Sequence, residues 1–171
     1  MKKWTFILLL FLVSLPLVGQ GRAERKAAKA KKAGIAYQNM KTLISEGNFE
    51  FVGNWATPFN GIRVNLIGNP NYLRIVKDST STHLPFFGEV RRSVGYGQGS
   101  GVSFDGPLQE YTVAFDDTKH QIKISFRAKH QTELFDVRLE IAHSGNTTVI
   151  VNSSNRSVMR YQGLVAGFSD P

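Results

Sequence analysis

The chain has 171 residues and no cysteine, which excludes disulfides, thiol catalysis and thiolate metal sites. Its net charge of +8 is concentrated near the amino terminus, because residues 1–46 hold nine of the 21 basic side chains and two of the 13 acidic ones. Residues 47–171 carry 12 basic and 11 acidic side chains, a net charge of +1, so the overall charge does not indicate nucleic acid as a partner.

The first 19 residues have the pattern of a secretory signal peptide. A lysine pair precedes an apolar stretch of about ten residues, 4–13, and Pro16 and the small residue Gly19 follow. This stretch is shorter than the ~20 residues that a membrane-spanning helix needs. We therefore expect cleavage after Gly19, or after Ala23 as a second site, and a mature protein that is periplasmic or secreted.

Residues 20–46 form a basic arm rich in alanine and lysine, which favour helix. The part from Arg22 to Lys32 has almost no large apolar side chain to bury. We expect it to be partly helical and solvated, or in peripheral contact with an anionic envelope surface. A helix is predicted near 35–45, covering one end or edge of the core through four side chains: Ile35, Met40, Leu43 and Ile44.

After residue 47 the apolar side chains recur at every second position, as in strands with one buried and one exposed face. The alternation is clearest in residues 122–128 and 135–141, and turn sequences such as 116–119 and 144–146 separate the segments. We count nine or ten strands. Residues 47–171 are therefore predicted to form an all-β domain, an antiparallel meander that closes into a lipocalin-like barrel or a curved sandwich.

The string HLPFFG at residues 83–88 is the most distinctive short sequence of this domain. Pro85 cannot donate a ladder hydrogen bond, so it should mark a sheet edge or the start of a strand. In an extended chain Phe86 and Phe87 point to opposite faces, so one enters the core. The other is covered by the amino-terminal helix or a partner, or lines a pocket; we favour the helix as its cover.

Residues 88–101 contain five glycines and Tyr96, and they are predicted to form a mobile loop or a lid over the end of the sheet. This loop lacks the spacing of a phosphate-binding loop. The four histidines, His83, His120, His130 and His143, form no metal-binding pattern, and no G-x-S-x-G element is present. We therefore expect no catalysis, no cofactor and no metal site.

The order of sequence features resembles a family of small exported proteins of Bacteroidetes-type bacteria that is known as a domain of unknown function. A signal peptide and an Ala/Lys-rich helix precede five short strings: 49–51 (FEF), 84–88 (LPFFG), 101–104 (GVSF), 151–156 (VNSSNR) and 161–163 (YQG). The resemblance covers nearly the whole mature chain. It implies a location in the cell envelope and assigns no activity, cofactor or catalytic residue.

These observations favour an exported, non-catalytic binding protein. It would hold a small apolar or amphipathic ligand in the mouth of the barrel, with Phe86, Phe87 and Tyr96 as contacts. The alternative is an envelope interaction protein that docks on a partner through a sheet face or through the basic arm. An enzyme is the third hypothesis, because no catalytic motif supports it.

Overall fold

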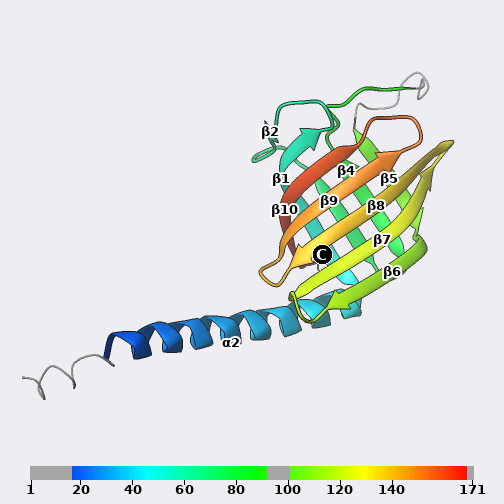
Figure 1. The fold of residues 1–171 in the computed structure, drawn as a ribbon. Coiled ribbons are helices and arrows are strands. Elements are labelled where there is room, and N and C mark those ends of the chain that lie inside the picture. Colours follow the sequence, from blue (N-terminus) through cyan, green and yellow to red (C-terminus); the bar gives the residue numbers. More distant parts are fainter. Residues whose placement is uncertain (1–16, 92–100, 169–171) are drawn as a thin grey trace, which may run out of the picture. The chain divides into compact units, whose positions relative to one another are not determined.

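The computed structural model describes residues 17–91 and 101–168, with side chains from residue 21 onward. Most of the predicted signal peptide and the segment 92–100, which contains Tyr96, lie outside these ranges. Figure 1 shows one helix and a curved antiparallel sheet. In chain order the elements are α2 (Leu17–Glu46), β1 (Asn48–Pro58), β2 (Val64–Asn65), β3 (Tyr72–Val76), β4 (Ser79–Leu84), β5 (Val102–Pro107), β6 (Gln109–Asp116), β7 (Gln121–His130), β8 (Glu133–Ala142), β9 (Asn146–Ser153) and β10 (Met159–Gly167).

The helix α2 is continuous over 30 residues, so it begins well before the helix predicted near 35–45. The side chains of residues 21–32 are all exposed, so intrinsic propensity rather than burial accounts for their helical conformation. No described helix combines the length and the apolarity that crossing a bilayer requires. The helix ends at Glu46, the predicted end of the arm, and Gly47 follows it with a φ of 71° that suits a residue without a Cβ. The chain divides into two compact units between Ile35 and Ala36.

Within the second unit, the last turns of α2 pack on one end of the sheet. Tyr37 and Ile44 are buried, and Met40 and Leu43 are partly buried against the core. Ile35, which was predicted to dock, is 56% exposed, so that prediction was wrong. The packing face follows positions 37, 40 and 44, and Ile35 falls outside this i, i+3, i+7 stripe.

The strands form a sheet in the order β5-β4-β3-β1-β10-β9-β8-β7-β6, in which every neighbouring pair is antiparallel and β2 pairs with β1 outside this path. The sheet curls until it nearly closes into a barrel (Figure 1). This confirms the predicted all-β antiparallel fold with one amino-terminal helix. β1 joins the two halves of the sheet, because it pairs with β3 on one side and with the carboxy-terminal β10 on the other, and β5 and β6 are the edge strands.

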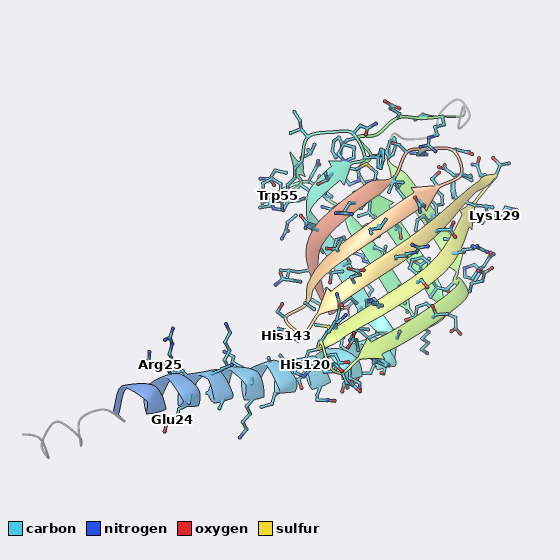
Figure 2. The ribbon with its side chains drawn as sticks, viewed as in Figure 1. Glu24, Arg25, Trp55, His120, Lys129 and His143 are labelled. Atoms are coloured by element: carbon cyan, nitrogen blue, oxygen red, sulfur yellow. The ribbon has the colours of Figure 1, made fainter. Side chains whose placement is uncertain are left out.

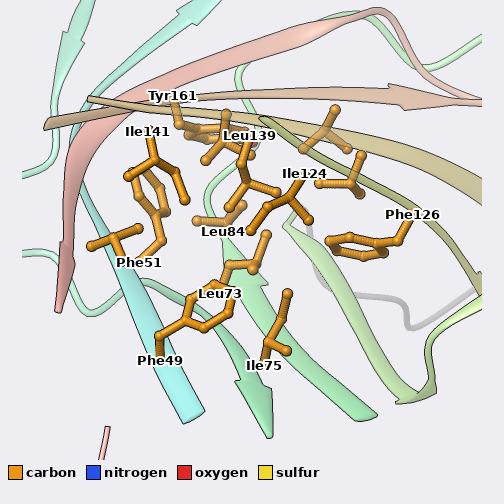
Figure 3. Close-up of a cluster of buried hydrophobic side chains, with 14 of the residues drawn as sticks. Phe49, Phe51, Leu73, Ile75, Leu84, Ile124, Phe126, Leu139, Ile141 and Tyr161 are labelled. Carbon is orange, nitrogen blue, oxygen red and sulfur yellow. The ribbon is translucent and has the colours of Figure 1, made fainter. Parts of the chain in front are cut away.

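The core lies between the walls of the barrel and consists of the inward-facing residues of the strands. In β8 buried and exposed residues alternate along the whole strand, as the sequence predicted. Phe104 of β5 lies 5.0 Å from Phe135 and 6.4 Å from Phe126, measured between ring centroids, so aromatic packing connects β5 to β7 and β8. Figure 3 shows buried side chains from several strands meeting in the interior, among them Phe49, Leu73, Ile124, Leu139 and Tyr161.

Candidate functional site

The candidate site is built at one end of the barrel, where the chain leaves β4. Pro85 directly follows the last residue of β4, so it marks the end of a strand and not the start that was considered. The Tyr161 hydroxyl donates a hydrogen bond of 2.8 Å to the Pro85 carbonyl oxygen. Burial raises the pKa of Tyr161, which keeps the hydroxyl protonated as a donor. The segment 85–91 is therefore attached to the core through its first residue.

The two phenylalanines after Pro85 have different environments. Phe86 is half-buried and packs against the core, with the Arg156 guanidinium carbon 5.3 Å from its ring centroid. Phe87 is 41% exposed and lines a pocket. The structure thus separates the pair as predicted, one residue inward and one outward. Phe87 lines this pocket together with residues 58–61, so the favoured expectation that the amino-terminal helix covers it was wrong.

A buried ion pair lies beneath this segment. Arg156 and Glu133 are both about one-twentieth exposed, and they meet through two hydrogen bonds, Nε–Oε1 at 3.0 Å and Nη2–Oε2 at 3.2 Å. The remaining terminal nitrogen, Nη1, donates to the Gly101 carbonyl oxygen at 2.7 Å. The Ser153 hydroxyl donates to the same Glu133 carboxylate. Each charged group therefore has several partners, which burial requires.

The backbone around Arg156 holds the segment that precedes residues 92–100. The Arg91 N–H donates to the Asn155 carbonyl oxygen at 2.7 Å, and the Ser157 N–H donates to the Glu89 carbonyl oxygen at 2.9 Å. The Glu89 N–H in turn donates to the Ser157 hydroxyl at 2.9 Å. Since Arg156 also binds Gly101, the turn 153–157 holds the described residues on both sides of 92–100.

A buried ion pair of this kind adds little net stability to a core. Desolvating two charges costs several kcal/mol per ion, about as much as their attraction returns, whereas leaving one of them unpaired is strongly destabilising. Within the described ranges no buried side-chain nitrogen or oxygen lacks a hydrogen-bond partner. A fully satisfied network of this kind specifies one geometry for the groups it joins. Here it positions the segment that carries Phe87.

The pocket above this network has a volume of about 240 Å³. Phe59, which is 74% exposed, and Phe87 contribute aromatic surface from two separate loops. Arg91 and Glu89 supply a positive and a negative charge to the lining. A Cβ on Gly88 would lie 2.2 Å from the Ser157 hydroxyl oxygen, so the close packing of this segment requires glycine. The pocket offers an apolar wall beside a charged group.

Sequence reasoning identified Phe87 but missed Phe59, Arg156 and Glu133. Glu133 had a signal, because it shares the odd-numbered positions of β8 with four buried apolar residues and so falls on the inner face. Arg156 lies in an irregular turn, where no periodicity indicates burial. Tyr96, the third predicted contact, lies outside the described residues.

The histidines lie where the sequence placed them, mostly at strand ends. His120 and His143 are neighbours near the end of α2, with ring centroids 6.5 Å apart (Figure 2). His130 is the last residue of β7, and His83 in β4 shares a hydrogen bond of 3.1 Å with the Ser103 hydroxyl. Across residues 17–91 and 101–168, no group of three or more His, Asp or Glu side chains is arranged to hold a metal ion.

Comparison with known proteins gives a family and a fold. The model of a domain of unknown function, DUF4251, matches residues 31–165. The crystal structure of a DUF4251 family protein from Bacteroides eggerthii DSM 20697 has 19% sequence identity and a TM-score of 0.62, and the alignment covers 80% of this chain and 91% of that one. No curated protein matches the chain. Because the family model covers most of its length, the chain belongs to the DUF4251 family of domains of unknown function.

Proposed function

We propose that the protein is an exported, non-catalytic binding protein whose site is the pocket between Phe59 and Phe87. The ligand is a small amphipathic anion: its apolar part lies against the two rings, and its carboxylate lies beside Arg91. The observation that carries the proposal is the pair of exposed phenylalanines from two loops that line one pocket. Exposed large apolar side chains that converge in this way are typical of ligand sites.

The size of the pocket limits the ligand. Sites that enclose drug-sized molecules have volumes of about 300–1,000 Å³. A pocket of about 240 Å³ suits a short acyl chain or a single aromatic ring. Burying such a group removes apolar surface from water at roughly 25 cal/mol per Å². The contact set proposed here is Phe59, Phe87 and Arg91, whereas Phe86 packs against the core and does not line the pocket.

Charge favours an anionic over a neutral ligand. Arg91 is exposed and forms no ion pair with any carboxylate of the described chain. A guanidinium presents a fork of N–H donors that matches a carboxylate. Glu89 also lines the pocket, and its repulsion disfavours ligands with more than one negative charge.

Titration with sodium octanoate, followed by amide chemical shifts in NMR spectra, tests this proposal. We expect saturable shifts around Gly88 and Ser157, and smaller shifts with octanol because it lacks the charge. Phe87→Ser should weaken octanoate binding at least tenfold. Phe115→Ser is the matched control, because Phe115 is 40% exposed, against 41% for Phe87, and lies on β6 outside the pocket. Equal affinities of the two variants, or shifts without saturation, would contradict the proposal.

A second candidate is docking on an envelope protein through the same end of the barrel. It is favoured by exposed apolar residues that neighbour the pocket in sequence but do not line it, Ile62 at 88% and Val90 at 53%. The variant Ile62→Ser separates the two functions, because it should reduce partner capture from the envelope fraction and leave octanoate binding unchanged.

The basic arm from Arg22 to Lys32 is exposed throughout. We propose that it makes a weaker, electrostatic contact with anionic envelope surfaces, and added salt should abolish this contact.

A further inference from the structure

A second hollow lies on the outer face of the sheet over β1, β10 and β9. It has a volume of about 400 Å³. Figure 2 shows Trp55 at this outer side of the barrel. Most of its lining residues have polar side chains, and it contains no phenylalanine, in contrast to the pocket between Phe59 and Phe87. Its lining residues are Asn54, Trp55, Arg63, Asn146, Thr147, Thr148, Gln162 and Gly163.

A bulge in β1 creates this hollow. The pairing of β1 with β10 shifts between Gly53 and Trp55, so Asn54 has no partner in the ladder. The burial pattern of β1 alternates up to this point and then gives two consecutive half-exposed residues, Asn54 and Trp55. A bulge re-aims side chains in this way. Both residues are therefore turned away from the core.

Specific contacts hold the bulge in place. The side-chain amide of Asn71, 6% exposed, accepts from the Gly53 N–H at 2.8 Å and donates to the Gly53 carbonyl oxygen at 3.0 Å. The Asn54 carbonyl oxygen accepts a hydrogen bond of 2.9 Å from the Leu66 N–H. A Cβ on Gly163 would lie 1.9 Å from the Val52 carbonyl oxygen, so the two backbones meet there without room for a side chain. The hollow is a defined feature of the sheet.

Trp55 and Arg63 form the wall of the hollow. The guanidinium carbon of Arg63 lies 4.2 Å from the Trp55 ring centroid, a cation–π contact. Among the described residues that line the hollow, only Arg63 carries a formal charge. Arg63 is exposed and forms no ion pair within the described chain. Its guanidinium is thus held by the ring while its N–H groups remain available to a carboxylate.

The rest of the lining suits hydroxyl groups. The side-chain amides of Asn54 and Gln162 make no hydrogen bond with any described residue, and neither does the Thr148 hydroxyl. An amide offers both donors and an acceptor, and a threonine hydroxyl does the same. A ligand with several hydroxyls satisfies such groups, whereas an apolar ligand leaves them unpaired at a cost.

From this arrangement we propose that the hollow binds an acidic sugar of the hexuronate type. The carboxylate pairs with Arg63, and the ring hydroxyls bond to the side chains of Asn54, Thr148 and Gln162. The exposed part of the Trp55 indole contacts the C–H groups of the sugar ring. This site is separate from the pocket of Phe59 and Phe87, and neither proposal depends on the other.

Tryptophan fluorescence measures the occupancy of this site directly. The chain has two tryptophans, and Trp4 lies in the predicted signal peptide. With Trp4→Phe, Trp55 is the single emitter whether or not residues 1–19 are removed. We expect sodium glucuronate to change its emission saturably, with glucose binding at least tenfold more weakly and acetate more weakly still. The NMR signals of the Asn54 and Gln162 side-chain amides give a second readout.

Two variants in the Trp4→Phe background complete the test, with NMR shifts as the readout because Arg63 itself influences Trp55 emission. Arg63→Gln should weaken glucuronate binding at least tenfold and leave glucose binding nearly unchanged. Arg160→Gln is the matched control, since this exposed arginine of β10 lies two residues from Gln162 and does not line the hollow. Three results would overturn the proposal: no saturable response to glucuronate, equal affinities of the two variants, or acetate binding as tightly as glucuronate. The last would indicate a site for a bare carboxylate, such as a peptide carboxy terminus.

Discussion

Replacing Glu133 by Gln tests the buried ion pair under the candidate site. The substitution keeps the size of the side chain and one acceptor oxygen, but it removes the charge that faces Arg156. Because both side chains are only 5% exposed, water cannot solvate the Arg156 cation that the substitution leaves without a counterion. Leaving one member of a buried pair without its partner costs about 3–5 kcal/mol. That is a large part of the ~5–15 kcal/mol that holds a domain together.

Urea unfolding is the assay. At a slope of about 2 kcal/mol per M, Glu133→Gln should lower the midpoint by roughly 1.5–2.5 M without changing the slope. The double variant Glu133→Gln with Arg156→Met should cost less than the sum of the two single changes, because it removes both charges. In hydrogen exchange, the Arg91 and Ser157 amides should lose protection, since their acceptors belong to the same cluster.

Arg127→Gln provides the control. Arg127 also contacts two carboxylates, Glu110 and Asp136, but its side chain is 51% exposed. Water and salt screen exposed ion pairs, so this change should lower the midpoint only slightly. If Glu133→Gln costs no more than Arg127→Gln, the argument that burial makes the Glu133 pair decisive is refuted.

Three further predictions follow from close contacts elsewhere. Gly163→Ala places a methyl group against the Val52 carbonyl oxygen and should lower stability by about 1–3 kcal/mol in thermal unfolding; an unchanged melting temperature would mean that the bulge relaxes freely. Asn71→Ala leaves two backbone groups of the bulge unpaired and should cost about 1–3 kcal/mol in urea, with NMR shifts at Trp55; loss of stability without those shifts would contradict its role in the bulge. Burial and the hydrogen bond to Asp117 raise the pKa of Tyr37 from the ordinary 10 to about 12. The contribution of Tyr37 to the free energy of unfolding is therefore complete below pH 10 and declines as the pH rises toward 12. Ultraviolet titration of the tyrosines, compared with Tyr37→Phe, should show one fewer high-pKa group in the variant, and identical curves would contradict this assignment.

The strands were predictable because burial on one face leaves a period of two in the sequence. In β7 and β8 this period is almost unbroken, and the turns at 116–119 and 144–146 carry residues that favour turns. Barrel and sandwich could not be separated, since both alternate in the same way. The pairing of β1 with both β3 and β10 makes one continuous sheet of the two halves, and no local pattern encodes this long-range register.

The errors around the helix and the site have physical causes. Tyr37 was left out of the docking stripe although it is buried, because its hydroxyl finds an acceptor in Asp117 at 2.9 Å that no local pattern reveals. Phe59 was missed because a single exposed aromatic residue in a loop has no periodicity. Arg156 and Glu133 are 23 positions apart and meet only in the folded chain. The sequence could therefore predict the sheet and Phe87, but not Phe59 or the ion-pair network that holds the segment carrying Phe87.

The most direct test of the central claim is native mass spectrometry of the protein purified gently from its native source. The proposed binding site predicts an adduct of small mass that is lost on denaturation, is diminished in Phe87→Ser and persists in Phe115→Ser. A bare chain mass in the unaltered protein, or an adduct that both variants retain equally, would contradict the assignment of ligand binding to the pocket of Phe59 and Phe87.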